Sequence, residues 1–454
     1  MRYLYILLIF LLASMEMQAQ DNAMLFLRGV PQSMQLNPAF RPVKGSYFAL
    51  PALGSVQING QNTGFSWSEI ITKGQGLQQD SSIINIDNLA NSLQDNNLLA
   101  TEASVQIIGF GFELGESYLS FDINHKLKAK IQYPGSIMDL RHGNWDYEND
   151  KPINHSLSDL YVNGMNYTEF AIGYNRPITD NIMIGARIKY LFGVANVESE
   201  YFDVGVQTFD DGSMQVRSNA SFLTSLPMKI EYDDEGYVSS LSYDDDIDRG
   251  DLFTNENRGW GVDLGITWKP MTNLTIGAAV NDLGYINWKT RTTRFYTDGV
   301  FEFDGVDISD EISGEENDDE EDYWDQLADD FKDSFKVSEE EISYKTGLMG
   351  SFNLTANYQH RNWFNAGIVS KSYIVDGKWI PETTLAAALT PGNALSTVFT
   401  YSLRKNAPAN FGAGLALRGG PVQLYFVTDN LGSLMTPETA KYVNARLGIN
   451  LIFD

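Results

Sequence analysis

The sequence contains no cysteine among its 454 residues, and this absence excludes several kinds of chemistry. The chain can form no disulfide, thiolate metal site, cysteine nucleophile or lipidated N-terminal cysteine. Histidine is also scarce, with four residues in all. Basic residues are outnumbered, because 32 lysines and arginines stand against 59 aspartates and glutamates, for a formal net charge of −27. A chain this acidic lacks the basic face that nucleic-acid binding requires.

Long apolar runs are missing after the N-terminus, so no later stretch has the length of a membrane-spanning helix. The N-terminus itself has a short basic start, an apolar run at Leu4–Ala13 and a small-residue site that ends at Ala19. This order predicts a signal peptide over 1–19, with a retained helical anchor or a buried first element as the alternatives. We therefore expect an exported protein whose membrane spans, if any, are made of strands.

Apolar and polar residues alternate with a period of two along much of the remaining chain. In 181–192, for example, Ile184 lies on the apolar face and Arg187 on the polar face, and 118–131 and 442–453 repeat the pattern. Strict alternation indicates strands with one apolar face. These segments reach about ten residues or more, and aromatic residues recur near the ends of their apolar stripes, as tilted strands that cross a bilayer require. The pattern favours a membrane barrel over a soluble sandwich.

The fold class predicted from this pattern is all-β, a closed antiparallel transmembrane β-barrel of about 14 strands over 47–454, because short turns alternate with long polar loops. Residues 197–209 and 214–232 also look extended. As a hairpin above the membrane they leave the count at 14, and as membrane strands they raise it to 16. The predicted strands lie near 47–58, 101–114, 117–131, 166–176, 181–192, 257–268, 273–281, 343–358, 363–372, 384–390, 395–403, 410–418, 421–428 and 442–453.

Two long acidic loops, 196–257 and 282–342, are expected on the extracellular side. The second holds the acidic run Glu315–Asp322, followed by apolar residues at helical spacing, and we interpret it as a solvated loop with a short amphipathic helix. A calcium site or a docking helix is the alternative. Asp244–Asp251 resembles a calcium loop but has arginine where an EF-hand needs glycine. We assign no metal and no cofactor. The helically spaced residues are Trp324, Leu327, Phe331 and Phe335.

No catalytic constellation is evident, and we predict no enzymatic activity. The histidines do not assemble, since His125 falls on a predicted strand, His142 and His155 in one long loop and His360 in a short turn, and neither HExxH nor GxSxG occurs. The alternation directs several cations into the lumen, where they either pair with carboxylates or meet a substrate. The histidines are His125, His142, His155 and His360, and the lumen-facing cations are Lys126, Lys128, Lys130, Arg187, Lys189 and Arg446.

Residues Gln35–Pro42 read Gln-Leu-Asn-Pro-Ala-Phe-Arg-Pro. An Asn-Pro-Ala segment shortly after the signal peptide resembles long-chain fatty-acid transporter-like (FadL-like) barrels and related Bacteroidota outer-membrane proteins, including type IX secretion accessories. Val280–Gly284 and Val427–Gly432 resemble the Asn-Leu-Gly strand ends of that group. The whole sequence is most similar to a Bacteroidota family of barrels of unknown function. The resemblance implies a luminal N-terminal hatch or plug at 20–46, with ligand or hatch residues Asn37, Pro38, Ala39 and Phe40.

Two functions remain open from the sequence. The first is an outer-membrane barrel that passes a small hydrophobic molecule past its plug, as the resemblance implies. The second is a non-enzymatic accessory or scaffold subunit of an outer-membrane secretion or assembly complex, which the large acidic loops suggest. The expected location is the outer membrane, and the expected partners are membrane lipid, a hydrophobic small molecule or other outer-membrane proteins.

Overall fold

The computed structural model describes residues 21–41, 44–73, 82–226, 228–232, 238–243, 256–303, 334–375, 378–403 and 410–453. The predicted signal peptide, the acidic run Glu315–Asp322 and the segment Asp244–Asp251 lie outside these residues. None of the helices in the described part of the chain has the length and apolar character needed to cross a membrane.

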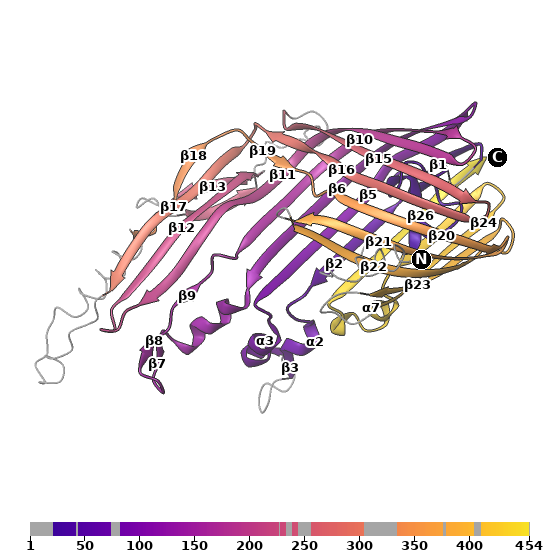
Figure 1. The fold of residues 1–454 in the computed structure, drawn as a ribbon. Helices are drawn as coiled ribbons and strands as arrows, with labels where there is room; N and C mark the ends of the chain where they lie inside the picture. The colour runs from indigo at the N-terminus through magenta and orange to yellow at the C-terminus, as the bar shows by residue number, and fades with distance from the viewer. Residues whose placement is uncertain are drawn as a thin grey trace, which may run out of the picture.

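Fourteen antiparallel strands close into a barrel, as the alternation predicted (Figure 1). The last strand returns to the first, so that Phe453 faces Ser46 and Leu447 faces Val56. Closure leaves no unpaired edge in the wall, which is what a strand structure in lipid requires. The wall strands are β1 (Ser46–Ala49) with β2 (Val56–Asn62), β5 (Asn96–Leu114), β6 (Ser117–Pro134), β10 (Tyr161–Thr179), β11 (Ile182–Thr208), β15 (Arg258–Met271), β16 (Leu274–Trp288), β20 (Ser351–Arg361) with the short β19 (Tyr344–Gly347), β21 (Phe364–Val375), β22 (Lys378–Leu389), β23 (Leu395–Leu403), β24 (Asn410–Gly419), β25 (Val422–Thr428) and β26 (Tyr442–Phe453).

Side chains of the wall strands alternate between the outer surface and the interior. On β11, Ile184 and Ile188 are 41% and 56% exposed on the outside, whereas Arg187 and Lys189 are 2% and 1% exposed on the inside. Because successive residues of a strand point to opposite faces, this single register gives the barrel an apolar exterior and a polar interior.

The first wall strand is broken, although a continuous strand over 47–58 was predicted. Residues Leu50–Ser55 leave the ladder between β1 and β2, and Ala52 adopts a positive φ of 58°. The wall stays joined across the break, because the backbone N–H of Ala52 donates to Ile107 at 3.1 Å and that of Gln106 donates to Ser55 at 2.8 Å. The break is therefore a local bulge in a wall that remains hydrogen-bonded.

Strand β11 continues beyond the barrel and supports a second sheet (Figure 1). Its outer part pairs with β12 (Met214–Ser225), which pairs with β17 (Thr292–Phe303), which in turn pairs with β18 (Ser338–Glu341). On its other edge it pairs with β9 (His155–Ser156). We call these strands the extension sheet. They lie outside the closed ring, so the count of 14 is confirmed and the alternative count of 16 is wrong.

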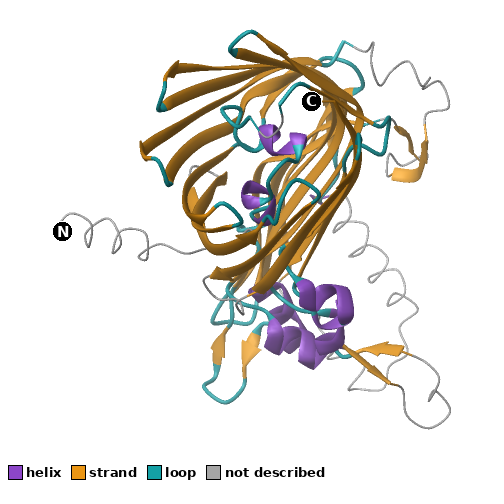
Figure 2. Ribbon diagram, turned by 90° about the vertical axis from the view of Figure 1, so that its right-hand side faces the viewer, coloured by secondary structure: helices purple, strands orange, loops and turns teal. Residues whose placement is uncertain are grey.

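Short elements occupy the connections. The helices α2 (Trp67–Ile70), α3 (Ile86–Ser92) and η4 (Gly135–His142) gather at one end of the barrel (Figure 2). A capping box starts α2, because the Ser66 N–H donates to the Glu69 carboxylate at 2.7 Å. The other short elements are β3 (Ile71–Lys73), β4 (Ser82–Ile84), β7 (Trp145–Asp146), β8 (Lys151–Pro152), β13 (Met228–Tyr232), β14 (Val238–Tyr243), α7 (Leu431–Met435) and η5 (Pro437–Thr439).

Candidate functional site in the barrel interior

Residues 21–41, here called the N-terminal segment, lie inside the ring of strands (Figure 1). The segment contains two 3₁₀ turns, η1 (Ala23–Phe26) and η2 (Pro31–Gln35), and proline at the first position of η2 favours that turn. Asp21 pairs with Arg446 of β26 at 2.9 Å. Gln32 Nε2 donates to Asn450 of β26 at 2.8 Å and to Gln106 of β5 at 3.0 Å. The segment is therefore bonded to inward-facing side chains of the wall.

The sequence-predicted residues Asn37–Phe40 form a tight turn within the segment. The Asn37 side chain accepts from the Ala39 N–H at 3.0 Å, and the Phe40 N–H donates to the Asn37 carbonyl at 2.9 Å. Asn175 of β10 donates to the carbonyls of Pro38 at 3.1 Å and Phe40 at 3.0 Å. Asn37 is fully buried. The turn thus fastens the segment to the wall, with the Asn37 side chain engaged inside the protein.

Three wall glycines make room for this turn. A Cβ atom on Gly185 would overlap the Pro38 carbonyl, and one on Gly265 would overlap the Asn37 side chain. A Cβ atom on Gly277 would lie 3.2 Å from Asn37 Nδ2. Because glycine has no Cβ, β11, β15 and β16 let the backbone of the turn approach closely. Gly185 and Gly277 end two sequence segments with the same turn chemistry, 172–185 and 266–277.

Both Asn-Leu-Gly segments noted in the sequence hold the N-terminal segment. Asn281 of β16 donates to the Leu36 carbonyl at 3.0 Å. The Asp429 carboxylate accepts from the backbone N–H groups of Asn22 and Ala23, both at 3.0 Å. These N–H groups stand at the start of η1, where a turn has no internal acceptor for them, so Asp429 acts as a cap supplied by a distant part of the chain.

The interior carries an ion-pair network on β6, β10, β11, β15 and β16, here called the charged wall. Arg187 lies 2.9 Å from Asp263, 3.2 Å from Asp122 and 3.6 Å from Glu169. Lys189 lies 2.6 Å from Asp263 and 2.5 Å from Asp282. Four of the predicted lumen-facing cations, Lys126, Lys128, Arg187 and Lys189, therefore have carboxylate partners on other wall strands, as buried charges require. Lys130 lies over the Tyr161 ring, at 5.1 Å. The charged wall consists of Asp122, Lys126, Lys128, Glu169, Arg187, Lys189, Asp263 and Asp282.

An apolar cluster lies on the facing part of the interior, among buried polar side chains such as Lys371 and Glu382, and we call it the apolar wall. Its inward-facing side chains belong to β21–β25, are at most 7% exposed, and pack against Met24, Phe26 and Leu27 of the N-terminal segment. Barrel interiors are usually polar, so an apolar stripe there is a departure. Sequence reasoning missed it, although the unbroken apolar run Leu385–Leu389 signals a strand that is apolar on both faces. The apolar wall consists of Val369, Ala386, Ala388, Val398, Ala416 and Val427.

The histidines hold structural contacts. His125 Nδ1 lies 3.0 Å from the Thr168 hydroxyl, and His155 Nε2 lies 2.9 Å from the Gly143 carbonyl. Within the described ranges, histidine, aspartate and glutamate form no group of three or more that could hold a metal ion.

Residues 38–429 match a family described as a family of unknown function, DUF5723. The chain belongs to this family. The matched region starts within the Asn37–Phe40 turn and ends at Asp429, so it contains both walls of the interior. A search of curated proteins gave no match.

Solved structures with a similar course of the chain include two toluene transporters and a FadL homologue. The Ralstonia pickettii toluene transporter TbuX is 8% identical, with a TM-score of 0.43 and 98% of each chain covered. A Pseudomonas aeruginosa FadL homologue is 10% identical, with a TM-score of 0.42, and the match covers 97% of this chain and 100% of that chain. The Pseudomonas putida toluene transporter TodX is 10% identical, with a TM-score of 0.40 and coverages of 96% and 97%. Likeness at this level says nothing about what the present chain binds.

Proposed function

We propose that this protein is an outer-membrane barrel that lets a small apolar molecule pass, and that the N-terminal segment is the plug of its lumen. The exterior supports the membrane location, because outward-facing residues such as Leu264, Ile266 and Leu447 are 42% to 49% exposed. Exposed apolar side chains around the whole ring suit contact with lipid rather than water. Export would follow from the predicted signal peptide at 1–19.

The observation that carries the proposal is the cover over the apolar wall. Met24, Phe26 and Leu27 seal side chains of β21–β25 that would otherwise line an open lumen. Leaving such a stripe in water costs about 25 cal/mol for each Å² of apolar surface, so it needs an apolar occupant. The plug is that occupant in the closed state, and an apolar molecule replaces it when the plug moves.

The two ends of the plug differ in how they are held. Asn37–Phe40 sits among three glycines and is bonded by Asn175, so we assign these residues to the fixed end. The other end is held by Asp429 and Arg446, whose bonds to Asn22, Ala23 and Asp21 are separate polar contacts. Hydrogen bonds to charged groups contribute about 1.5–3 kcal/mol each, and none of these contacts belongs to the ladder of the wall strands, so we assign this end to the part that can be displaced without unfolding the barrel.

The break in the first strand gives the molecule a lateral exit. Gln32 of the plug donates to the Gly54 carbonyl within the break at 3.0 Å, and the Tyr425 hydroxyl donates to the same carbonyl at 3.0 Å. Movement of the plug removes the bond from Gln32, and the exit further requires the backbone bonds that join Leu50–Ser55 to β5 and β26 to open. An apolar molecule that follows the apolar wall then leaves through the side of the barrel into the bilayer.

Cross-linking the plug tests this function, and the absence of native cysteine makes the pair unique. Asn22 Nδ2 donates to the Thr384 hydroxyl at 3.0 Å, so Asn22→Cys with Thr384→Cys can be joined by a short bismaleimide. Uptake of the uncharged dye N-phenyl-1-naphthylamine by intact cells is the measurement. We expect uptake by the double variant to fall to the level of cells without the protein once the link is formed.

The matched controls are each single cysteine variant treated with the same reagent, which should keep their uptake. Deletion of residues 21–41 should raise uptake of the dye and of a polar dye alike. Unchanged uptake after complete cross-linking would contradict the plug, and no uptake by the protein in any form would contradict transport.

A further inference from the structure

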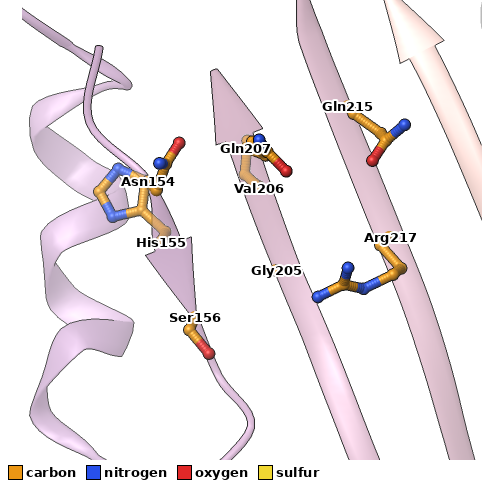
Figure 3. A pocket seen from close by; sticks show the side chains of 8 residues that line it. All are labelled: Asn154, His155, Ser156, Gly205, Val206, Gln207, Gln215 and Arg217. Atoms are coloured by element: carbon orange, nitrogen blue, oxygen red, sulfur yellow. The ribbon is translucent and has the colours of Figure 1, made fainter. Parts of the chain in front are cut away.

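The extension sheet carries a cavity of about 190 Å³ that lies outside the barrel interior (Figure 3). Its lining comes from β9, β11 and β12 and from residues next to β9. Gly205 in this lining is 13 positions beyond Phe192, where pairing with β15 ends. At about 3.3 Å per residue, the cavity lies roughly 43 Å further along the strand than the wall. It is therefore separate from the proposed path through the lumen.

Strand register explains why the cavity forms here. Gly205 of β11 faces Ser156 of β9 on one edge and Arg217 of β12 on the other, while Gln207 faces Gln215. Because side chains two residues apart share a face, Gln207, Gln215 and Arg217 stand around the position of Gly205. A Cβ atom on Gly205 would lie 2.7 Å from the His155 carbonyl, so glycine lets β9 approach closely, and the backbones of β9 and β11 form the floor of the cavity. Figure 3 shows the Arg217 side chain reaching across toward Gly205.

Three polar side chains around this floor are each held in place by a hydrogen bond or an ion pair through one polar atom. Arg217 Nη2 lies 3.3 Å from the Asp203 carboxylate, and Gln215 Nε2 donates to Glu302 at 3.0 Å. Asn154 Oδ1 accepts from the Thr208 N–H at 2.8 Å. The remaining donors and acceptors of these groups are available to a ligand. Gln207 makes no side-chain hydrogen bond to the described part of the chain, so its amide is available as a whole.

The chemistry of the lining selects the ligand. Asp203 and Glu302 stand next to the donors of Arg217 and Gln215 and oppose an anion, while the Arg217 guanidinium opposes a cation. Amide groups both donate and accept hydrogen bonds, which matches hydroxyl groups that do the same. Cavities for drug-sized ligands hold about 300–1,000 Å³, so this one suits a single ring. We propose that the cavity binds one neutral sugar unit of a glycan.

Saturation-transfer NMR on the whole barrel in detergent tests this proposal. The probes are the methyl glycosides of glucose, galactose, mannose and N-acetylglucosamine, titrated separately. We expect saturable binding of at least one, weakened tenfold or more in Gln207→Leu and in Arg217→Met. Both residues lie on the extension sheet, and heat-modifiable gel mobility checks that each variant is folded. The control is Gln359→Ala, an exposed glutamine at the far end of β20, which should bind as the wild type does.

The competing outcomes are distinct. Absence of saturable binding for all four glycosides overturns the proposal, as does equal binding by Gln207→Leu and Arg217→Met. Tighter binding of sulfate or acetate than of any glycoside overturns it in favour of an anion site. Vesicles that carry the bound sugar as a lipid headgroup distinguish the source, because tighter binding to them than to the free glycoside assigns the sugar to a membrane glycolipid.

Discussion

The charged wall and the apolar wall bury their inward-facing side chains in different ways. Arg187 and Lys189 are neutralised by carboxylates of neighbouring strands, and the ion pairs of the charged wall join one strand to another. The side chains of the apolar wall do not cover one another, because residues such as Ala386 and Val398 are small. Met24, Phe26 and Leu27 of the N-terminal segment cover them. The charged wall therefore joins the wall strands to one another, and the apolar wall holds the N-terminal segment.

The largest expected effect comes from breaking the charged wall at its centre. Arg187→Met removes the ion-pair partner of Asp122, while Glu169 and Asp263 keep Lys189, and a buried charge that loses its partner costs about 3–5 kcal/mol. Urea unfolding in detergent, followed by heat-modifiable mobility, measures the free energy of unfolding. Arg294→Met is the control, because its partly exposed pairs with Glu200 and Glu340 contribute about 0–1 kcal/mol. Equal losses of unfolding free energy in Arg187→Met and Arg294→Met would show that the charged wall contributes no more to stability than exposed ion pairs do.

An effect of similar size but of another kind is expected on the apolar wall, where it leaves the stability of the barrel unchanged. Phe26→Ala removes a ring that fills the space above Gly367, and losing a buried phenylalanine costs about 3–5 kcal/mol, which here falls on docking of the plug. The barrel should unfold at nearly the wild-type urea concentration, while uptake of N-phenyl-1-naphthylamine rises. Phe399→Ala, which is 56% exposed on the outer surface, should change neither. Barrel unfolding at markedly lower urea would show that both walls stabilise the barrel.

The glycines under the Asn-Pro-Ala turn allow a finer test. Gly265→Ala places a Cβ on the Asn37 side chain, and overpacking of this kind costs about 1–3 kcal/mol. The N-terminal segment should become more sensitive to protease while the barrel remains intact. In Gly60→Ala the new Cβ meets no atom within 4 Å, so protease sensitivity should stay at the wild-type level. Greater protease sensitivity in Gly60→Ala than in Gly265→Ala would contradict the assignment of Asn37–Phe40 to the fixed end.

The smallest expected effect lies outside both walls. Glu69 pairs with Lys441 at 3.1 Å. Partial burial opposes its ionisation, but the Ser66 N–H and Lys441 together hold the pKa of Glu69 below its usual value. A lowered carboxyl pKa adds stability that is present above the ordinary pKa and is lost as pH falls through the folded value. Glu69→Gln should reduce urea resistance slightly at neutral pH, and the difference from wild type should vanish in acid. A difference in urea resistance between Glu69→Gln and the wild type that grows in acid would contradict a lowered pKa of Glu69.

Most of the wall was predictable from the sequence because period-two alternation directly encodes a sheet with one lipid-facing surface. The break at Leu50–Ser55 was not, since a bulge depends on contacts such as Tyr425 to Gly54 that join distant parts of the chain. The lumen-facing side of Arg187 and Lys189 was predictable, but their partners Asp263 and Asp282 depend on register. The apolar wall required knowing which segment fills the lumen, and a hydrophobic pattern does not give that partner.

The three glycines beneath Asn37 and Pro38 also constrain how the lumen can open. At Gly185 and Gly265 a Cβ would lie within 3 Å of the backbone of Pro38 or Ala39, so side chains at the neighbouring inward-facing positions of β11 and β15 would oppose a shift of the segment along these strands. The Asn37–Phe40 turn can therefore serve as the pivot of the proposed opening, and a swing about it would widen the lumen on the side of β21–β25, where the other end of the segment packs.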